Sequence, residues 1–99
     1  NGVWENKRIL PEGFVDYVRT PTEARGAENY GAHWWVSTNN KKGLLKNGPY
    51  DAFEAQGRDG QLIVIIPSKD LIIVRMGTNM KDDAWPKLGE FISQIAQNL

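Results

Sequence analysis

Two strand-forming runs separated by four turn residues constrain this chain more than any other feature. Residues 61–66 read Gln-Leu-Ile-Val-Ile-Ile, residues 71–76 read Leu-Ile-Ile-Val-Arg-Met, and Pro-Ser-Lys-Asp stands between them. Branched apolar residues favour strands, so this arrangement predicts an antiparallel hairpin. Leu62 to Ile66 are all apolar, whereas a strand with one solvated face would alternate. The hairpin therefore needs cover on both faces.

The end of the chain predicts a helix that covers one of these faces. Pro86 suits the first turn of a helix, and Asp82 or Asp83 can cap it. Gly89 in the interior costs about 1 kcal/mol relative to alanine, so we expect the helix to depend on packing against the sheet. Its apolar residues recur at intervals of three and four, as Trp85, Leu88, Phe91, Ile92, Ile95 and Leu99.

Shorter elements complete the expected fold, which is α/β of the α+β type, an antiparallel sheet packed against a C-terminal helix. Trp34 and Trp35 are adjacent on a predicted strand, so they should point to opposite faces of the sheet. The other expected elements are a helix over residues 11–19, strands over 30–37 and 52–56, and a hairpin extension at 44–45.

One face of this sheet is left without a covering layer. The helix over residues 11–19 is too short to cover it, and 99 residues without cysteine form one small unit with limited burial. The missing layer must come from a second copy of the chain, another chain, or an upstream part of the parent protein. We therefore expect residues 1–99 to be a single unit that depends on a partner surface.

Composition excludes several classes of function. Twelve basic and twelve acidic residues give no net charge, which argues against nucleic acid as a partner. The absence of cysteine excludes disulfide scaffolds, zinc ribbons and thiol catalysis. No apolar run approaches the roughly 20 residues of a membrane span. We expect no membrane span, no metal and no cofactor.

The chain carries no complete catalytic motif. Ser37, Ser68 and Ser93 are each followed three positions later by a residue other than lysine, so Ser-x-x-Lys is absent. His33 is the only histidine, and within a predicted strand it fits a packed or surface residue better than a base. The remaining candidate is Gly57-Arg58-Asp59-Gly60-Gln61, which is either an ordinary hairpin turn or a place where glycine lets a ligand approach the backbone.

Several segments together resemble the carboxy-terminal part of serine β-lactamase-like hydrolases of penicillin-binding-protein fold. The similarity is to the class C-related branch that includes 6-aminohexanoate-dimer hydrolases and esterases. The segments are Gly2-Val3-Trp4, Lys7 to Val15, Thr20-Pro21, Tyr30-Gly31 with Trp34-Trp35, Phe53-x-Ala55-x-Gly57-x-x-Gly60-Gln61, Pro67 and Asp70 to Arg75.

The resemblance implies a partial β-lactamase/transpeptidase-like fold in which this chain is the C-terminal segment of the domain. The family's nucleophilic serine and lysine would lie upstream of Asn1, so the chain alone is expected to be inactive. The resemblance fits a bacterial periplasmic or cytoplasmic protein, and the signal region would lie outside this sequence.

The resemblance also assigns site residues. Ala55-Gln56-Gly57 occupies the position of the family's Lys-Thr-Gly, of which only the glycine matches. The residue after that glycine usually gives its backbone N–H to the oxyanion hole, which makes Arg58 the expected catalytic donor. The missing lysine and threonine favour a small amide or ester substrate over penicillins. The expected substrate-binding residues are Gln56, Gly57, Asp59, Gly60 and Gln61.

Two functions remain open at this stage. The first is a segment of a serine hydrolase that acts through an acyl-enzyme and supplies the active-site strand and part of the oxyanion hole. The alternative is a non-catalytic interaction module, or an inactive member of the same family.

Overall fold

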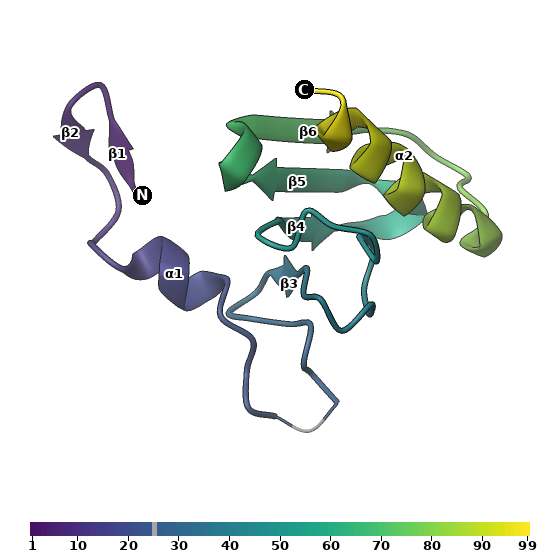
Figure 1. Cartoon of the computed structure of the whole chain (residues 1–99), viewed down its shortest axis with the longest axis horizontal. Coiled ribbons are helices and arrows are strands. Elements are labelled where there is room, and N and C mark those ends of the chain that lie inside the picture. The colour runs from purple at the N-terminus through teal and green to yellow at the C-terminus, as the bar shows by residue number, and fades with distance from the viewer. Residues whose placement is uncertain (25) are drawn as a thin grey trace.

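The chain has an α+β fold built on a four-stranded antiparallel sheet (Figure 1). The structure is a computed structural model, and it describes residues 1–24 and 26–99. The strands lie in the order β3-β4-β5-β6. Their bounds are Trp35–Val36 for β3, Phe53–Gln56 for β4, Leu62–Ile66 for β5 and Leu71–Arg75 for β6.

The predicted hairpin is confirmed as β5 and β6. Ile66 pairs with Leu71 and Leu62 with Arg75, so the turn comprises residues 67–70 as expected. Asp70 ends this turn in the left-handed region, with φ of 46°. Asp51 holds the turn from outside the hairpin, because its carboxylate accepts hydrogen bonds from Ser68 N at 2.6 Å and Ser68 Oγ at 2.8 Å.

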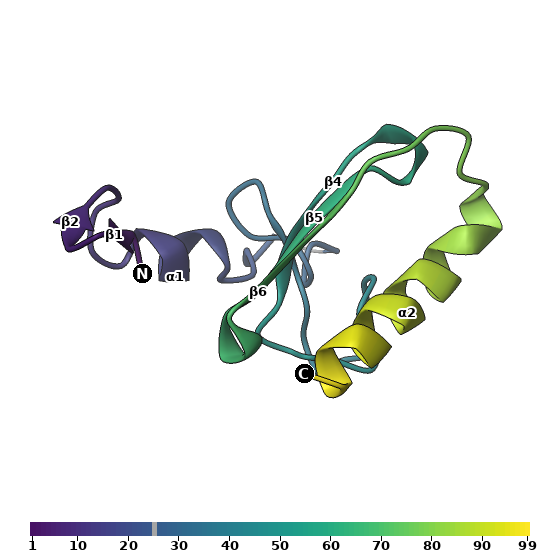
Figure 2. The same cartoon turned by 90° about the horizontal axis from the view of Figure 1, so that it is seen from above.

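One face of the sheet is covered by α2, Trp85–Gln97 (Figure 2). Pro86 lies in its first turn as predicted, but no side chain caps the helix, because Asp82 and Asp83 lie in a preceding 3-10 turn, Asp82–Ala84. The predicted apolar face is partly wrong, since Phe91 and Leu99 are exposed. The core between α2 and the sheet consists of Leu45, Ala52, Leu62, Val64, Ile66, Ile92 and Ala96.

The segment before β4 packs directly on α2. Leu44 and Leu45 do not extend a hairpin, as the sequence suggested; Leu45 is instead fully buried in the core. A β-carbon at Gly89 would collide with the carbonyl of Leu44. This close approach explains a glycine inside a helix, where it would otherwise be unfavourable.

The opposite face of the sheet is open over its β5–β6 half. Ile63 pairs with Val74 and Ile65 with Ile72, so these four side chains share one face, which we call the open face. Ile63, Ile72 and Val74 are 41%, 65% and 59% exposed. For the part of the chain that the structure describes, this confirms the prediction that one face of the hairpin lacks a covering layer.

Beside β3, aromatic residues pack on both faces of the sheet. The Trp35 ring lies 4.8 Å from that of Tyr30, and the Trp34 ring lies 5.1 Å from that of Phe53, so the two tryptophans diverge as predicted. The strand is much shorter than the expected residues 30–37. His33 has φ of 68°, a left-handed conformation that strands do not contain, and it is an exposed turn residue rather than a strand residue.

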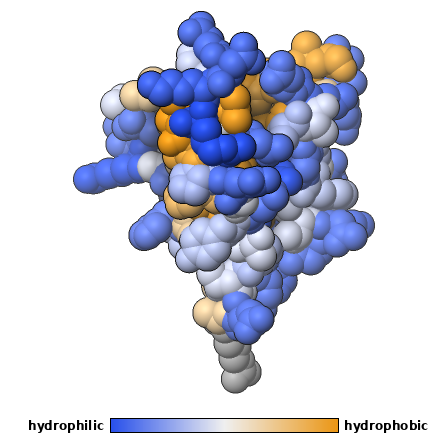
Figure 3. Space-filling model, turned by 90° about the vertical axis from the view of Figure 1, so that its left-hand side faces the viewer, coloured by the Kyte–Doolittle hydropathy of each residue, from blue (hydrophilic) through white to orange (hydrophobic). Residues whose placement is uncertain are grey.

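Residues 1–19 form an N-terminal arm beside the sheet (Figure 1). The arm contains β1, Val3–Trp4, paired with β2, Lys7–Arg8, and then α1, Phe14–Val18. The helix begins later than predicted because Gly13, with φ of 79°, cannot continue it toward Pro11. Figure 3, viewed from the side of the arm, shows apolar surface between hydrophilic side chains.

Among the helices of residues 1–24 and 26–99, none is long and apolar enough to cross a membrane.

Candidate functional site

The site residues expected from the resemblance lie together in the connection between β4 and β5. Gly57 is exposed and extended, with φ of −115° and ψ of 176°, and Arg58–Gly60 then form a 3-10 turn. Gly57 N donates to Gln61 O at 2.7 Å, and Gln61 N donates to Arg58 O at 3.2 Å. The segment is thus a closed hairpin turn in which Gly57 and Arg58 are the exposed residues.

Gly60 holds this turn together. It is buried, with φ of 79°, and its carbonyl accepts a 2.8 Å hydrogen bond from the Arg75 guanidinium, which also donates to Asp59 O at 3.3 Å. A β-carbon at Gly60 would collide with Met80 Sδ. Gly60 therefore fixes the backbone of the turn, and its burial removes it from direct contact with a ligand.

The edge of β4 is uncovered where this connection begins. Backbone groups alternate in direction along a strand, and Gly57 N–H points toward β5, so the N–H groups of Gln56 and Arg58 point away from β5. On that side β3 pairs only as far as Glu54, because the chain turns away at His33. We call the stretch from Gln56 to Arg58 the open edge of β4. Within the described part of the chain, Arg58 N–H donates no hydrogen bond.

A buried carboxylate, that of Glu54, lies on the face of β4 that α2 covers. Glu54 is 1% exposed, and its Oε1 accepts a 3.1 Å hydrogen bond from Gln56 Nε2. Its Oε2 is buried and has no partner among the described residues. Burial raises the pKa of Glu54 to about 7, an effect that the Gln56 hydrogen bond opposes.

The sequence interpretation missed Glu54. The signal was its position in the predicted strand 52–56, two residues before Gln56, because residues two apart on a strand share a face. That face is the one on which α2 packs, since Glu54 pairs with the buried Val64.

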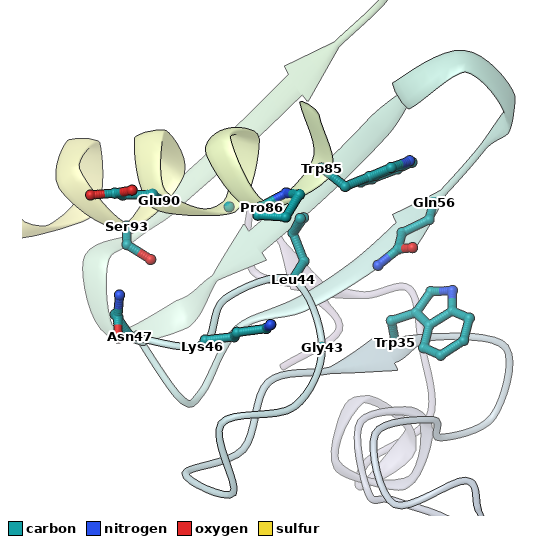
Figure 4. Close-up of a pocket in the computed structure, with 11 residues that line it drawn as sticks. Trp35, Gly43, Leu44, Lys46, Asn47, Gln56, Trp85, Pro86, Glu90 and Ser93 are labelled. Carbon is teal, nitrogen blue, oxygen red and sulfur yellow. The ribbon is translucent and has the colours of Figure 1, made fainter. Parts of the chain in front are cut away.

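A cavity of about 450 Å³ opens between α2, the segment before β4 and the end of β4 (Figure 4). Figure 4 shows Gln56 lying between Trp35 and Trp85 at one end, with Leu44 and Pro86 beside them. Lys46 and Glu90, both exposed, line the cavity as well. The other lining residues are Gly43, Asn47, Gly89 and Ser93.

The serines of the described residues carry no catalytic partner. Ser68 is bonded to Asp51, and Ser93 Oγ donates to the Gly48 carbonyl. Ser37 is buried, and its hydroxyl has no partner among residues 1–24 and 26–99. The same residues contain no group of three metal-ligating side chains.

No protein-family model matches the chain, and no curated protein matches it either. The resemblance to the β-lactamase-like hydrolases is thus a resemblance of the sequence segments given above and of nothing further.

Proposed function

We propose that this chain is the C-terminal segment of a serine hydrolase that cleaves a small amide or ester through an acyl-enzyme. The observation that carries the proposal is the open edge of β4, where the N–H of Arg58 has no acceptor within the described residues and follows an exposed, extended glycine. An oxyanion hole requires such backbone donors, directed at the place where negative charge develops.

The side chains around the open edge support an amide or ester over a β-lactam. The positions of the family's lysine and threonine hold Ala55 and Gln56, so these two positions offer no cationic group to a carboxylate on the substrate. The backbone donor does not depend on side-chain identity. The proposed substrate-binding residues remain Gln56, Gly57, Asp59 and Gln61. Buried Gly60 holds the backbone of this turn in place through its hydrogen bond with Arg75.

The nucleophile would come from an upstream part of the parent protein. The described serines lack basic partners, so this chain alone should not turn over substrate. The open face supports this arrangement, because Ile63, Ile72 and Val74 present apolar surface that a covering layer would bury.

Arg58→Pro in the parent protein tests the proposed donor. Proline removes the N–H, and Gly57 already has the extended conformation that a residue before proline favours. We expect labelling by a fluorophosphonate probe and ester turnover to fall about 10²- to 10³-fold. Arg58→Ala is the matched control, since it keeps the N–H, and it should retain most activity.

Equal activity of the two variants would refute the role of Arg58. The sequence encoded immediately before Asn1 gives an independent check, because the proposal requires a Ser-x-x-Lys on a predicted helix there.

A second candidate function is a non-catalytic interaction module. The open face favours it independently of the β4 edge, because an apolar sheet face is also a protein-binding surface. Light scattering distinguishes the two: a stable homo-oligomer of this chain, together with no probe labelling of the parent protein, would favour the interaction module.

A further inference from the structure

The cavity beside α2 combines two tryptophan side chains with the Gln56 amide, which a hydrogen bond to Glu54 holds in place. Trp35 and Trp85 bound the end of the cavity where the Gln56 amide lies (Figure 4). Leu44 and Pro86 add apolar surface beside them. Mostly apolar cavities of this size with a few convergent polar groups are typical of small-molecule sites.

The Gln56 amide presents a hydrogen-bond acceptor at this end. Gln56 Nε2 donates to Glu54 Oε1 at 3.1 Å. The other end of the amide, Gln56 Oε1, is therefore the atom left to accept a hydrogen bond from a ligand. Glu54 is fully buried, and no lysine or arginine in the described residues forms an ion pair with it. When Glu54 is ionised, no described lysine or arginine neutralises its negative charge. This charge polarises the Gln56 amide and makes Gln56 Oε1 a stronger acceptor for a positively charged donor.

The other charged residues that line the cavity do not oppose the binding of a cationic ligand. Lys46 and Glu90 contribute one charge of each sign, and both are exposed to water. Tryptophan faces attract organic cations, which adds to the effect of the buried carboxylate.

We propose that this cavity binds a flat aromatic ammonium compound, whose N–H donates to Gln56 Oε1 while its ring lies against Trp35 and Trp85. Glu54 acts as a positioning residue, because it orients Gln56 and supplies the negative charge without touching the ligand. Gln56 belongs both to this cavity and to the open edge of β4, but the ligand contacts only its side chain. Arg58→Pro removes a backbone N–H two residues further along, so it should leave the cavity intact.

Titration with 2-naphthylmethylammonium tests the proposal at about pH 8, where Glu54, with a pKa of about 7, is ionised. Indole N–H signals in ¹H–¹⁵N spectra report the position of binding. The signals of Trp35 and Trp85 should shift and saturate, while the signal of Trp4, which lies in the N-terminal arm, should not move. The neutral 2-naphthylmethanol and the anionic 2-naphthoate should bind at least about tenfold more weakly.

Two variants separate the roles of the polar groups. Gln56→Leu should weaken ammonium binding about tenfold or more, whereas Gln97→Leu, the same change at an exposed position of α2, should not. Glu54→Gln keeps an acceptor for Gln56 but removes the charge, so it should reduce the preference for the ammonium over the alcohol.

Each of several results would overturn the proposal. They are an absence of saturable shifts at Trp35 and Trp85, equal or tighter binding of the alcohol or the naphthoate, and an unchanged ammonium preference in Glu54→Gln. If Gln56→Leu does not fold, the ligand comparison on the unaltered chain still decides the outcome.

Discussion

The carbonyl of Leu44 packs against the α-carbon of Gly89, in the space that a β-carbon would fill. Gly89→Ala should therefore destabilise the chain by about 1–3 kcal/mol through overpacking, although alanine is the better helix former by about 1 kcal/mol. Urea unfolding measures the difference. Lys87→Ala, at an exposed position of the same helix, should have little effect, and an increase in stability from Gly89→Ala would contradict the packing described.

The bidentate contact of Asp51 with Ser68 stabilises the turn between β5 and β6. Asp51→Ala should lower the free energy of unfolding by about 1–3 kcal/mol, because it removes two hydrogen bonds to a charged acceptor. Asp51→Asn keeps one acceptor oxygen and should lose less. Thermal unfolding of the three proteins gives the order, and equal midpoints would show that the contact does not contribute.

Glu54 should make the stability of the chain depend on pH. Its pKa rises from an ordinary value of 4.5 to about 7 in the folded state, so the folded chain binds the extra proton between these values. The free energy of unfolding should fall as pH rises from about 4.5 to 7, by up to about 3 kcal/mol, and no further above that range.

Glu54→Gln should remove this decline with pH, because the amide does not titrate. Glu90→Gln, which replaces an exposed carboxylate on α2, is the matched control and should leave the decline in place. Urea unfolding at a series of pH values measures both. A decline of the same size in Glu54→Gln would assign it to another group.

The open face should bind apolar dyes. Replacing Ile72 and Val74 by lysine should reduce the fluorescence of an anilinonaphthalene dye and any self-association, with little loss of stability, because both side chains are already more than half exposed. Tyr17→Lys, on the N-terminal arm, is a control of similar exposure. Unchanged dye binding in the double variant would place the apolar surface elsewhere.

The sequence predicted the central elements because their patterns are strong and local. The run from Leu62 to Ile66, the turn beginning at Pro67 and the periodicity after Pro86 each satisfy one rule, and each matches an observed element. The divergence of Trp34 and Trp35 followed from strand geometry alone. Local regularity of this kind needs no knowledge of the partner surface.

Features that depend on distant segments were not predictable in this way. Leu45 is in the core because the backbone beside it fits against Gly89, and Glu54 is buried because α2 covers its face of β4. Phe91 has helical spacing but lies outside the face that meets the sheet. β3 begins only at Trp35, after the left-handed His33, and this late start exposes the edge of β4. The strand-forming sequence around it gave no sign of this.

The N-terminal arm has a consequence for amide hydrogen exchange. The backbone of the arm is hydrogen-bonded to the rest of the chain at the end of α1, where Ala32 N donates to Val18 O at 3.1 Å. Within residues 1–19, Val18 is the one buried hydrophobic residue. Amide protons of β1 and β2 can therefore exchange through local opening that leaves the sheet folded, whereas those of β5, paired on both sides, exchange only when the core opens. The protection of β5 thus reports the global free energy of unfolding, and that of the arm does not.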